Sequence, residues 1–164
     1  MAVRGPVGVG VMVMTLPFEV GVVVRDLGLM ERFYCDVLGC RAERRSGVPE
    51  SVGGPAGLGG ELVVAWLRVP SGGCVKLILP RSAPVPERAA ASPAGRPGLS
   101  YLTFHFDDMG PVVEALRAAG ARPLSDPVVV RARGRRISFW ADPEGNSVEL
   151  VDARGGDPDP GRSN

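Results

Sequence analysis

The side chains that could carry out acid–base chemistry are few in this chain of 164 residues. Lys76 is the only lysine and His105 the only histidine, so any site that requires two imidazole groups is excluded. Carboxylates that meet a lysine in an apolar cavity could move a proton and stabilise the negative charge that develops on a substrate. The three cysteines, Cys35, Cys40 and Cys74, have neither metal-type spacing nor an evident base beside them, so nucleophilic catalysis has no support.

A repeat in the sequence brings candidate residues into equivalent positions. The stretch from Glu19 to Asp26 returns 82 residues later as the stretch from Tyr101 to Asp108, and each is a short apolar strand that ends in an Asp. Further along each copy, a Pro-x-Gly turn leads into another strand, and an offset of 73 residues there pairs Lys76 with Glu149. A duplicated unit of strand, helix and further strands predicts two modules of the same fold.

Composition limits the class of protein. With 45% hydrophobic and 23% charged residues, the chain is typical of a soluble globular protein, and a net charge of +1 gives no reason to expect nucleic-acid binding. The apolar run from Val7 to Met14 is far shorter than the roughly 20 residues of a membrane span, and no signal-peptide cleavage site follows it. An odd number of cysteines without a disulfide pattern favours a reducing compartment. We therefore expect a cytoplasmic protein that binds neither nucleic acid nor a membrane.

Periodicity divides the chain into two β-α-β-β-β modules joined by a linker. The expected segments are an N-terminal extension that forms an edge strand or a dimer strap, a first module, a linker, a second module and a disordered tail, at residues 1–17, 18–80, 81–97, 98–152 and 153–164. Together they are expected to make one α+β domain.

Local signals place the helix ends and one long loop. Asp26 and Asp108 are expected to cap the helices that follow them, and Gly39 and Gly120 to end those helices in a left-handed conformation. The stretch 46–60 is too rich in Gly and Pro to hold regular structure. A loop of that length in a compact domain is usually a lid, a binding loop or disordered.

These modules resemble those of the vicinal oxygen chelate superfamily, which includes glyoxalase I, methylmalonyl-CoA epimerase, extradiol dioxygenases, and fosfomycin and bleomycin resistance proteins. The motifs that carry the resemblance are Val20-Gly-Val-Val-Val-Arg-Asp-Leu27, Phe33-Tyr-Cys-Asp-Val-Leu-Gly39, Phe104-His-Phe-Asp-Asp108 and Phe139-Trp-Ala-Asp-Pro-Glu-Gly-Asn-Ser-Val-Glu-Leu150. The resemblance covers roughly residues 18 to 152. It implies that the two modules form a half-barrel sheet and, because the family habitually pairs barrels, that the protein is a homodimer. Function does not follow from this fold, since the superfamily includes enzymes and pure binding proteins.

The resemblance also locates the positions that hold a metal ion in metal-binding members. Those members take a His or Gln from the first strand of each module and a Glu from the last strand of each. In this chain the four positions are Glu19, Lys76, Tyr101 and Glu149. A charged lysine cannot be a metal ligand, and a lone buried ammonium group is very costly. We therefore expect Lys76 to lie between Glu19 and Glu149 and to replace the metal, which gives a site with no cofactor.

Each candidate residue also has a purely structural explanation. Lys76 and Glu149 could form a salt bridge that only satisfies the barrel centre, and Tyr101 could fill the core. His105 shares a face with Tyr101 and could be a second proton carrier or a structural histidine. The other candidates for substrate contact, each with core packing or a solvated surface as its alternative, are Trp66, Phe104, Trp140 and Arg136. The last belongs to a basic cluster at 131–136 that could bind a phosphate or carboxylate.

Two classes of function fit these residues. The first is a metal-independent enzyme of bacterial specialised metabolism that isomerises, cyclises or eliminates from a small organic metabolite. In it, Glu19 or Glu149 moves a proton, Lys76 stabilises an enolate or alkoxide, and Tyr101 donates. The alternative is a protein that sequesters a small molecule, as bleomycin resistance proteins do, but an aromatic content of 5% disfavours a stacking-type binder. A metal-dependent enzyme of the glyoxalase, epimerase or dioxygenase type is a third possibility.

Overall fold

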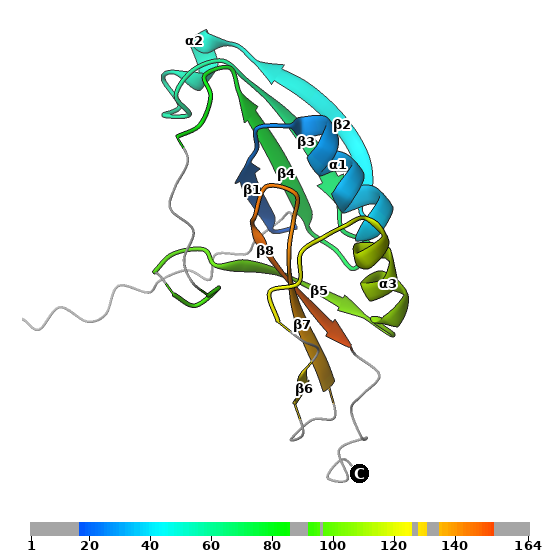
Figure 1. The fold of residues 1–164 in the computed structure, drawn as a ribbon. Coiled ribbons are helices and arrows are strands. Elements are labelled where there is room, and N and C mark those ends of the chain that lie inside the picture. Colours follow the sequence, from blue (N-terminus) through cyan, green and yellow to red (C-terminus); the bar gives the residue numbers. More distant parts are fainter. Residues whose placement is uncertain (1–16, 86–91, 96, 126–127, 131–134, 153–164) are drawn as a thin grey trace, which may run out of the picture.

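The computed structural model describes residues 17–85, 92–95, 97–125, 128–130 and 135–152. Residues 1–16 of the expected N-terminal extension, and the whole of the expected tail, lie outside the described residues. The α+β class with two tandem modules is confirmed (Figure 1).

Each module forms its own four-stranded sheet. In the first module the elements are β1 (Glu19–Val23), α1 (Leu27–Arg32), a π-helix η1 (Phe33–Val37), β2 (Arg41–Val48), α2 (Glu50–Gly53), β3 (Leu62–Arg68) and β4 (Cys74–Pro80). In the second they are β5 (Tyr101–Phe106), α3 (Gly110–Ala118), β6 (Val128–Val130), β7 (Arg135–Ala141) and β8 (Ser147–Asp152). Sheet 1 has the strand order β1-β4-β3-β2 and sheet 2 the order β5-β8-β7-β6. Within each module the first and last strands are parallel neighbours, and the other neighbouring strands are antiparallel.

The helices begin and end close to the predicted residues. Asp26 is the N-cap of α1, and its side chain accepts a hydrogen bond of 2.8 Å from the backbone N–H of Leu29. In the second module the N-cap is Met109, not Asp108 as expected. Asp108, the residue before this N-cap, still accepts a hydrogen bond of 2.9 Å from the backbone N–H of Gly110, the first residue of α3. Gly39 and Gly120 both have positive φ, as predicted.

The expectation of an irregular loop over 46–60 is wrong for its first half. β2 continues to Val48, which pairs with Leu62, and the short helix α2 follows directly. Gly53 allows a close backbone contact, because a Cβ there would lie 1.9 Å from the carbonyl oxygen of Gly60. The Gly and Pro content of this stretch therefore predicted too little regular structure, because composition alone does not show such local packing.

The register of the strands reproduces the sequence repeat. Gly21 on β1 is paired with Lys76 on β4, and Thr103 on β5 is paired with Glu149 on β8. These two pairs are related by the same offsets of 82 and 73 residues that relate the two copies in the sequence. The structure therefore confirms that Lys76 and Glu149 occupy equivalent positions in the two sheets.

The two modules share one hydrophobic core, and each sheet turns one face towards it. The helices α1 and α3 lie along the same side of the molecule (Figure 1). The buried ring of Tyr34 on η1 lies 6.3 Å from the ring of Phe104 on β5, and α3 adds the buried side chains of Val113 and Leu116. We call the opposite side of each sheet, away from the helices, its open face.

Strand alternation determines which side chains lie on each open face. Sheet 1 buries Ala65, Leu67, Val75 and Leu77 against the helices, and sheet 2 buries Phe104, Trp140, Val148 and Leu150. The open face of sheet 1 therefore includes Glu19, Arg44, Trp66, Arg68 and Lys76. The open face of sheet 2 carries Tyr101, Thr103, His105, Phe139 and Glu149.

Candidate functional site

Half of the candidate site lies on the open face of sheet 1. The ammonium Nζ of Lys76 lies 3.0 Å from the carboxylate Oε2 of Glu19, so this part of the predicted arrangement is present. The two side chains are 31% and 42% exposed, respectively. Water therefore reaches the pair in the single chain, in contrast to the buried ammonium that the sequence led us to expect. A salt bridge with this exposure contributes at most about 1 kcal/mol.

The other half lies on the open face of sheet 2. The carboxylate of Glu149 accepts a hydrogen bond of 2.7 Å from the hydroxyl of Thr103. Tyr101 is 41% exposed, and its ring stands edge-on to the ring of Phe139 at 5.2 Å. Sequence reasoning missed Thr103, although its position two residues after Tyr101 on the same strand face was a usable signal.

The two halves do not meet within one chain. Among the described residues, no hydrogen bond or ion pair joins Lys76 to Glu149, and Lys76 pairs with Glu19 alone. The expected position of Lys76 between two carboxylates is therefore not observed in the single chain. The reason is that β4 and β8 belong to separate sheets with no strand pairing between them.

The remaining predicted contact residues divide between the open faces and the core. Trp66 lies on the open face of sheet 1 with the guanidinium of Arg44 over its ring, and His105 is exposed on that of sheet 2. Phe104 and Trp140 are buried on the helix side, at 6% and 2% exposure. Core packing therefore accounts for these two rings.

Arg136 binds carboxylates of its own chain. Its guanidinium group donates hydrogen bonds to Asp152 and lies 3.4 Å from Asp108. The hydrogen bond to Asp152 is the main reason that the pKa of Arg136 is raised above its ordinary value. The neighbouring residues 131–134 of the predicted basic cluster lie outside the described part of the chain. The contacts of Arg136 serve to hold β7, β8 and the β5–α3 connection together.

The four family positions do not fit a metal ion in this chain. The ammonium group of Lys76 has no lone pair and lies against Glu19, the other family position in sheet 1. Within the described ranges, no three His, Cys, Asp or Glu side chains come together as metal ligands. The chemistry of this donor set favours proton transfer and charge stabilisation by the side chains themselves.

The thiols are not activated for nucleophilic attack. Cys35, Cys40 and Cys74 are all free. Burial, with smaller effects from Cys35 and Cys74, raises the pKa of Cys40 to about 12. Burial also raises the pKa of Cys35 and of Cys74. The nucleophilic form is the thiolate, which these surroundings disfavour near neutral pH.

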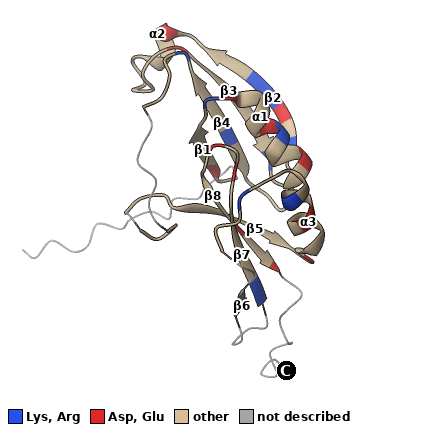
Figure 2. Ribbon diagram, viewed as in Figure 1, with Lys and Arg blue, Asp and Glu red and all other residues tan. Residues whose placement is uncertain are grey.

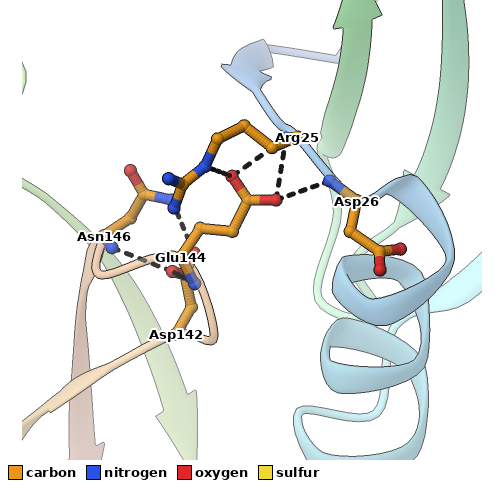
Figure 3. A network of polar contacts seen from close by, with 5 residues as sticks. All are labelled: Arg25, Asp26, Asp142, Glu144 and Asn146. Atoms are coloured by element: carbon orange, nitrogen blue, oxygen red, sulfur yellow. Dashed lines mark hydrogen bonds and ion pairs between the residues drawn. The ribbon is translucent and has the colours of Figure 1, made fainter. Parts of the chain in front are cut away.

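A polar clamp, formed by Glu144 with Arg25 and Asp26, fixes one module against the other (Figure 3). The Glu144 carboxylate accepts from the backbone N–H groups of Arg25 and Asp26 at 2.7–2.9 Å, and from the Arg25 side chain at 3.3 Å. Its side chain is only 9% exposed. The turn between β7 and β8 is thereby attached to the β1–α1 junction, which positions the two half-sites relative to each other.

Asp142 supports this clamp from the buried side of the same turn. It accepts from the backbone N–H groups of Glu144 and Asn146, from the Asn146 amide and from the Tyr34 hydroxyl at 3.2 Å. Burial raises the pKa of Asp142, although hydrogen bonds from Asn146, Glu144 and Tyr34 act in the opposite direction. The turn is therefore fixed by a carboxyl group that holds its proton more firmly than an ordinary Asp.

This shift predicts a pH dependence of stability. Between the ordinary pKa of Asp and the raised pKa of Asp142, the folded protein binds more protons than the unfolded chain. The free energy of unfolding should therefore fall as pH rises through that interval, with a slope of up to about 1.4 kcal/mol per pH unit from this group. Urea unfolding measured from about pH 4 upward should show the slope in the wild type. The slope should be absent in Asp142→Asn, and an identical pH profile for the two proteins would contradict the assignment.

No helix among the described residues is long and apolar enough to cross a membrane.

Comparisons with known proteins agree with the architecture. A family model described as the Glyoxalase/Bleomycin resistance protein/Dioxygenase superfamily matches residues 18–139. A glyoxalase family protein from Bacillus cereus has 22% identity and a TM-score of 0.74, with 88% of this chain and 98% of that chain covered. A glyoxylase/bleomycin resistance protein/dioxygenase domain from Frankia has 19% identity and a TM-score of 0.67, covering 89% and 96%.

Longer relatives are matched over part of their length. A glyoxalase I variant from Zea mays has 18% identity and a TM-score of 0.62, and the match covers 87% of this chain but 46% of the maize chain. A protein of Brassica oleracea var. gemmifera named "Putative lactoylglutathione lyase" is 35% identical over 63 residues, which cover 38% of this chain and 22% of the plant protein. Given the match of the family model to most of the chain, this protein belongs to the glyoxalase/bleomycin resistance protein/dioxygenase superfamily.

Proposed function

We propose that the protein is a metal-independent enzyme that performs acid–base chemistry on a small organic molecule. The observation that carries this proposal is the Lys76–Glu19 ion pair at 3.0 Å. It occupies a position where metal-binding relatives, by the resemblance of the sequence, place part of their metal site. A fixed ammonium group there can stabilise a developing oxyanion without a metal.

We further propose that two copies of the chain complete the active site. The open face of sheet 1 in one copy would face the open face of sheet 2 in the other. The supporting observations are the separate half-sites and the edge positions of β1 and β5, which leave one side of each strand unpaired within its sheet. Because this chain covers 46% of the maize glyoxalase I chain, two copies would supply a comparable length of chain. A symmetric homodimer would contain two such sites.

The contacts distinguish the roles of the two carboxylates. Glu19 is neutralised by Lys76 and is therefore assigned the task of orienting the ammonium group. Glu149 accepts a hydrogen bond from the Thr103 hydroxyl, and no cation contacts it among the described residues, so it is assigned as the proton carrier in this proposal. Glu149 would take a proton from a carbon beside a carbonyl group, and the electron pair of the C–H bond would move to the carbonyl oxygen. Lys76 stabilises that enolate, with Tyr101 as a hydroxyl donor nearby.

Return of the proton then determines the reaction type. Delivery of the proton from Glu149 to another carbon of the enolate gives isomerisation. If instead the enolate expels a leaving group from the carbon next to the deprotonated one, and that group takes the proton from Glu149, the reaction is an elimination. Both outcomes balance without an oxidant, a reductant or a metal.

Sequestration of a small molecule is the second candidate function. The observation that favours it is Trp66, a partly exposed aromatic ring on the open face of sheet 1. A protein of this kind would bind its ligand and leave the C–H bonds intact.

Deuterium exchange separates the two functions. Phenylpyruvate, a carbon acid, is incubated with the protein in deuterated buffer, and loss of its benzylic proton signal is followed by NMR. The proposal predicts exchange above the buffer rate that falls about a hundredfold or more in Glu149→Gln. Tight binding of carbon acids without any catalysed exchange would overturn the enzyme and favour sequestration.

The metal content gives an independent prediction. Elemental analysis of the purified protein should find far less than one zinc, iron, nickel or manganese ion per chain, because the donor set does not fit one. Dialysis against a chelator should leave any catalysed exchange unchanged. A metal ion bound in a ratio near one per chain, and lost in Glu149→Gln, would refute the replacement of the metal by Lys76.

A further inference from the structure

A row of side chains crosses the open face of sheet 1. Register pairs Arg44 on β2 with Trp66 on β3, and Trp66 with Lys76 on β4. Beyond Lys76 comes Gly21 on β1, which adds no side chain. Figure 2 shows basic positions on β2 and β4 of this sheet. Since neighbouring strands are about 4.8 Å apart and β3 lies between β2 and β4, the backbones at Arg44 and Lys76 are roughly 10 Å apart. The row presents two cations with an aromatic ring between them.

The guanidinium group of Arg44 is oriented by the indole ring. Its central carbon lies 3.7 Å from the Trp66 ring centroid, within the range of a cation–π contact. Among the described residues, it makes no hydrogen bond or ion pair. The neighbouring arginines differ, because Arg45 binds Glu31 at 2.6 Å and Arg68 binds Glu43 through two nitrogens. Arg44 thus holds its N–H donors in a fixed plane without an acceptor from the described chain.

The indole N–H of Trp66 adds another donor to this row. Trp140, buried in the core, donates its indole N–H to the hydroxyl of Ser138 at 2.8 Å. No such partner exists for the Trp66 N–H in the described part of the chain, and this side chain is partly exposed. The row therefore offers donors and positive charge to a ligand.

The equivalent row of sheet 2 has the opposite character. The repeat places Phe139 where sheet 1 has Trp66, and Glu149 where sheet 1 has Lys76. An anionic group is favoured beside Arg44 and disfavoured beside Glu149. Charge complementarity thus fixes which half of the site receives the anionic end of a ligand.

We propose that Arg44 and Trp66 recognise the carboxylate of a small molecule. The guanidinium group binds the carboxylate through two parallel N–H···O bonds, and the indole ring keeps the guanidinium flat against the sheet. The rest of the molecule extends along the row and brings its reacting carbon to Lys76. This assignment names a substrate class for the function proposed above, and it rests on that function only for the role of Lys76.

Equilibrium binding of cinnamate tests the proposal. Cinnamate is anionic, and cinnamamide is a neutral molecule of nearly the same shape. The chain has two tryptophans, so its NMR spectrum contains two indole N–H signals, and Trp66→Phe identifies which belongs to Trp66. Cinnamate should shift the Trp66 signal saturably and leave the buried Trp140 signal in place as a check of folding. Cinnamamide should bind about tenfold more weakly or worse.

Matched variants locate the anion. Arg44→Met should weaken cinnamate binding about tenfold or more and change cinnamamide binding little, while Arg44→Lys, which keeps the charge without the planar fork, should fall between. Arg45→Met removes an equal charge from the next residue and should bind cinnamate like the wild type. The proposal is overturned by an absence of saturable cinnamate binding, by equal affinities for cinnamate and cinnamamide, or by an Arg44→Met variant that is folded and binds normally.

The same variants separate this inference from the proposed function. Lys76→Met should retain cinnamate binding within a few-fold, because the carboxylate contacts Arg44. Arg44-dependent binding combined with full turnover in Lys76→Met would refute the acid–base mechanism and leave the anion site standing. Binding independent of Arg44, with turnover lost in Lys76→Met, would refute the anion site alone.

Discussion

Replacement of Lys76 by methionine should lower turnover about a hundredfold or more, the usual loss when one electrostatic contact to a developing oxyanion is removed. Methionine approximates the length of the lysine side chain without its charge. Ligand affinity should change little, because Lys76 acts mainly on charge that appears during the reaction. The measurement is the rate of catalysed deuterium exchange at saturating carbon acid, compared with the wild type.

The partial exposure of the Lys76–Glu19 pair makes this variant interpretable. The two side chains are 31% and 42% exposed, so loss of the pair should cost at most about 1 kcal/mol of unfolding free energy. Arg81→Met is a matched control, because it removes a cation from another exposed ion pair, with Glu61. The control should keep wild-type turnover. A folded Lys76→Met protein with undiminished turnover would end the catalytic role of this residue.

Glu144→Ala should lower the free energy of unfolding by about 2–4 kcal/mol. The carboxylate satisfies the N–H groups of Arg25 and Asp26 and binds the Arg25 side chain, and it is 9% exposed. Hydrogen bonds to a charged acceptor are stronger than neutral ones. Urea denaturation with the matched variant Glu114→Ala gives the comparison. Glu114 is 72% exposed in an ion pair with Arg117, so its loss should change stability by less than about 0.5 kcal/mol.

Loss of the clamp should also disturb the packing between the modules. In Glu144→Ala the contact between Tyr34 and Phe104 in the shared core should weaken, which near-ultraviolet circular dichroism would detect. Equal stability of Glu144→Ala and Glu114→Ala would show that the core alone fixes the modules.

Much of each module could be predicted from sequence because the signals are local. Alternating valines indicated β1, and Asp26 and Gly39 marked the ends of the first helical segment. The repeat was more informative still, since its offsets matched the parallel register of Lys76 and Glu149 in the two sheets. Equivalent residues on equivalent strands follow directly from duplication.

The arrangement of the two modules could not be predicted in the same way. It depends on Glu144, which contacts residues 118 and 119 positions earlier, and no local pattern announces such a contact. Sequence reasoning therefore placed Lys76 between two carboxylates, whereas in the described part of the chain it contacts the carboxylate of Glu19 alone. Arg44 was missed because a solvated strand arginine is the ordinary interpretation, and only its register beside Trp66 distinguishes it.

Zero-length crosslinking tests the central claim, that Lys76 of one chain and Glu149 of another form one site. Lys76 is the only lysine, so carbodiimide coupling through a lysine must involve this residue. Light chains and chains labelled with heavy isotopes are mixed, unfolded and refolded together, then coupled and analysed by mass spectrometry. The link between Lys76 and Glu19, 3.0 Å apart in one chain, is the internal control and should join only like isotopes. We expect a second link, Lys76 to Glu149, in which about half of the products join a light to a heavy chain. A Lys76–Glu149 link confined to like isotopes, or coupling of Lys76 to Glu19 alone, would contradict the account.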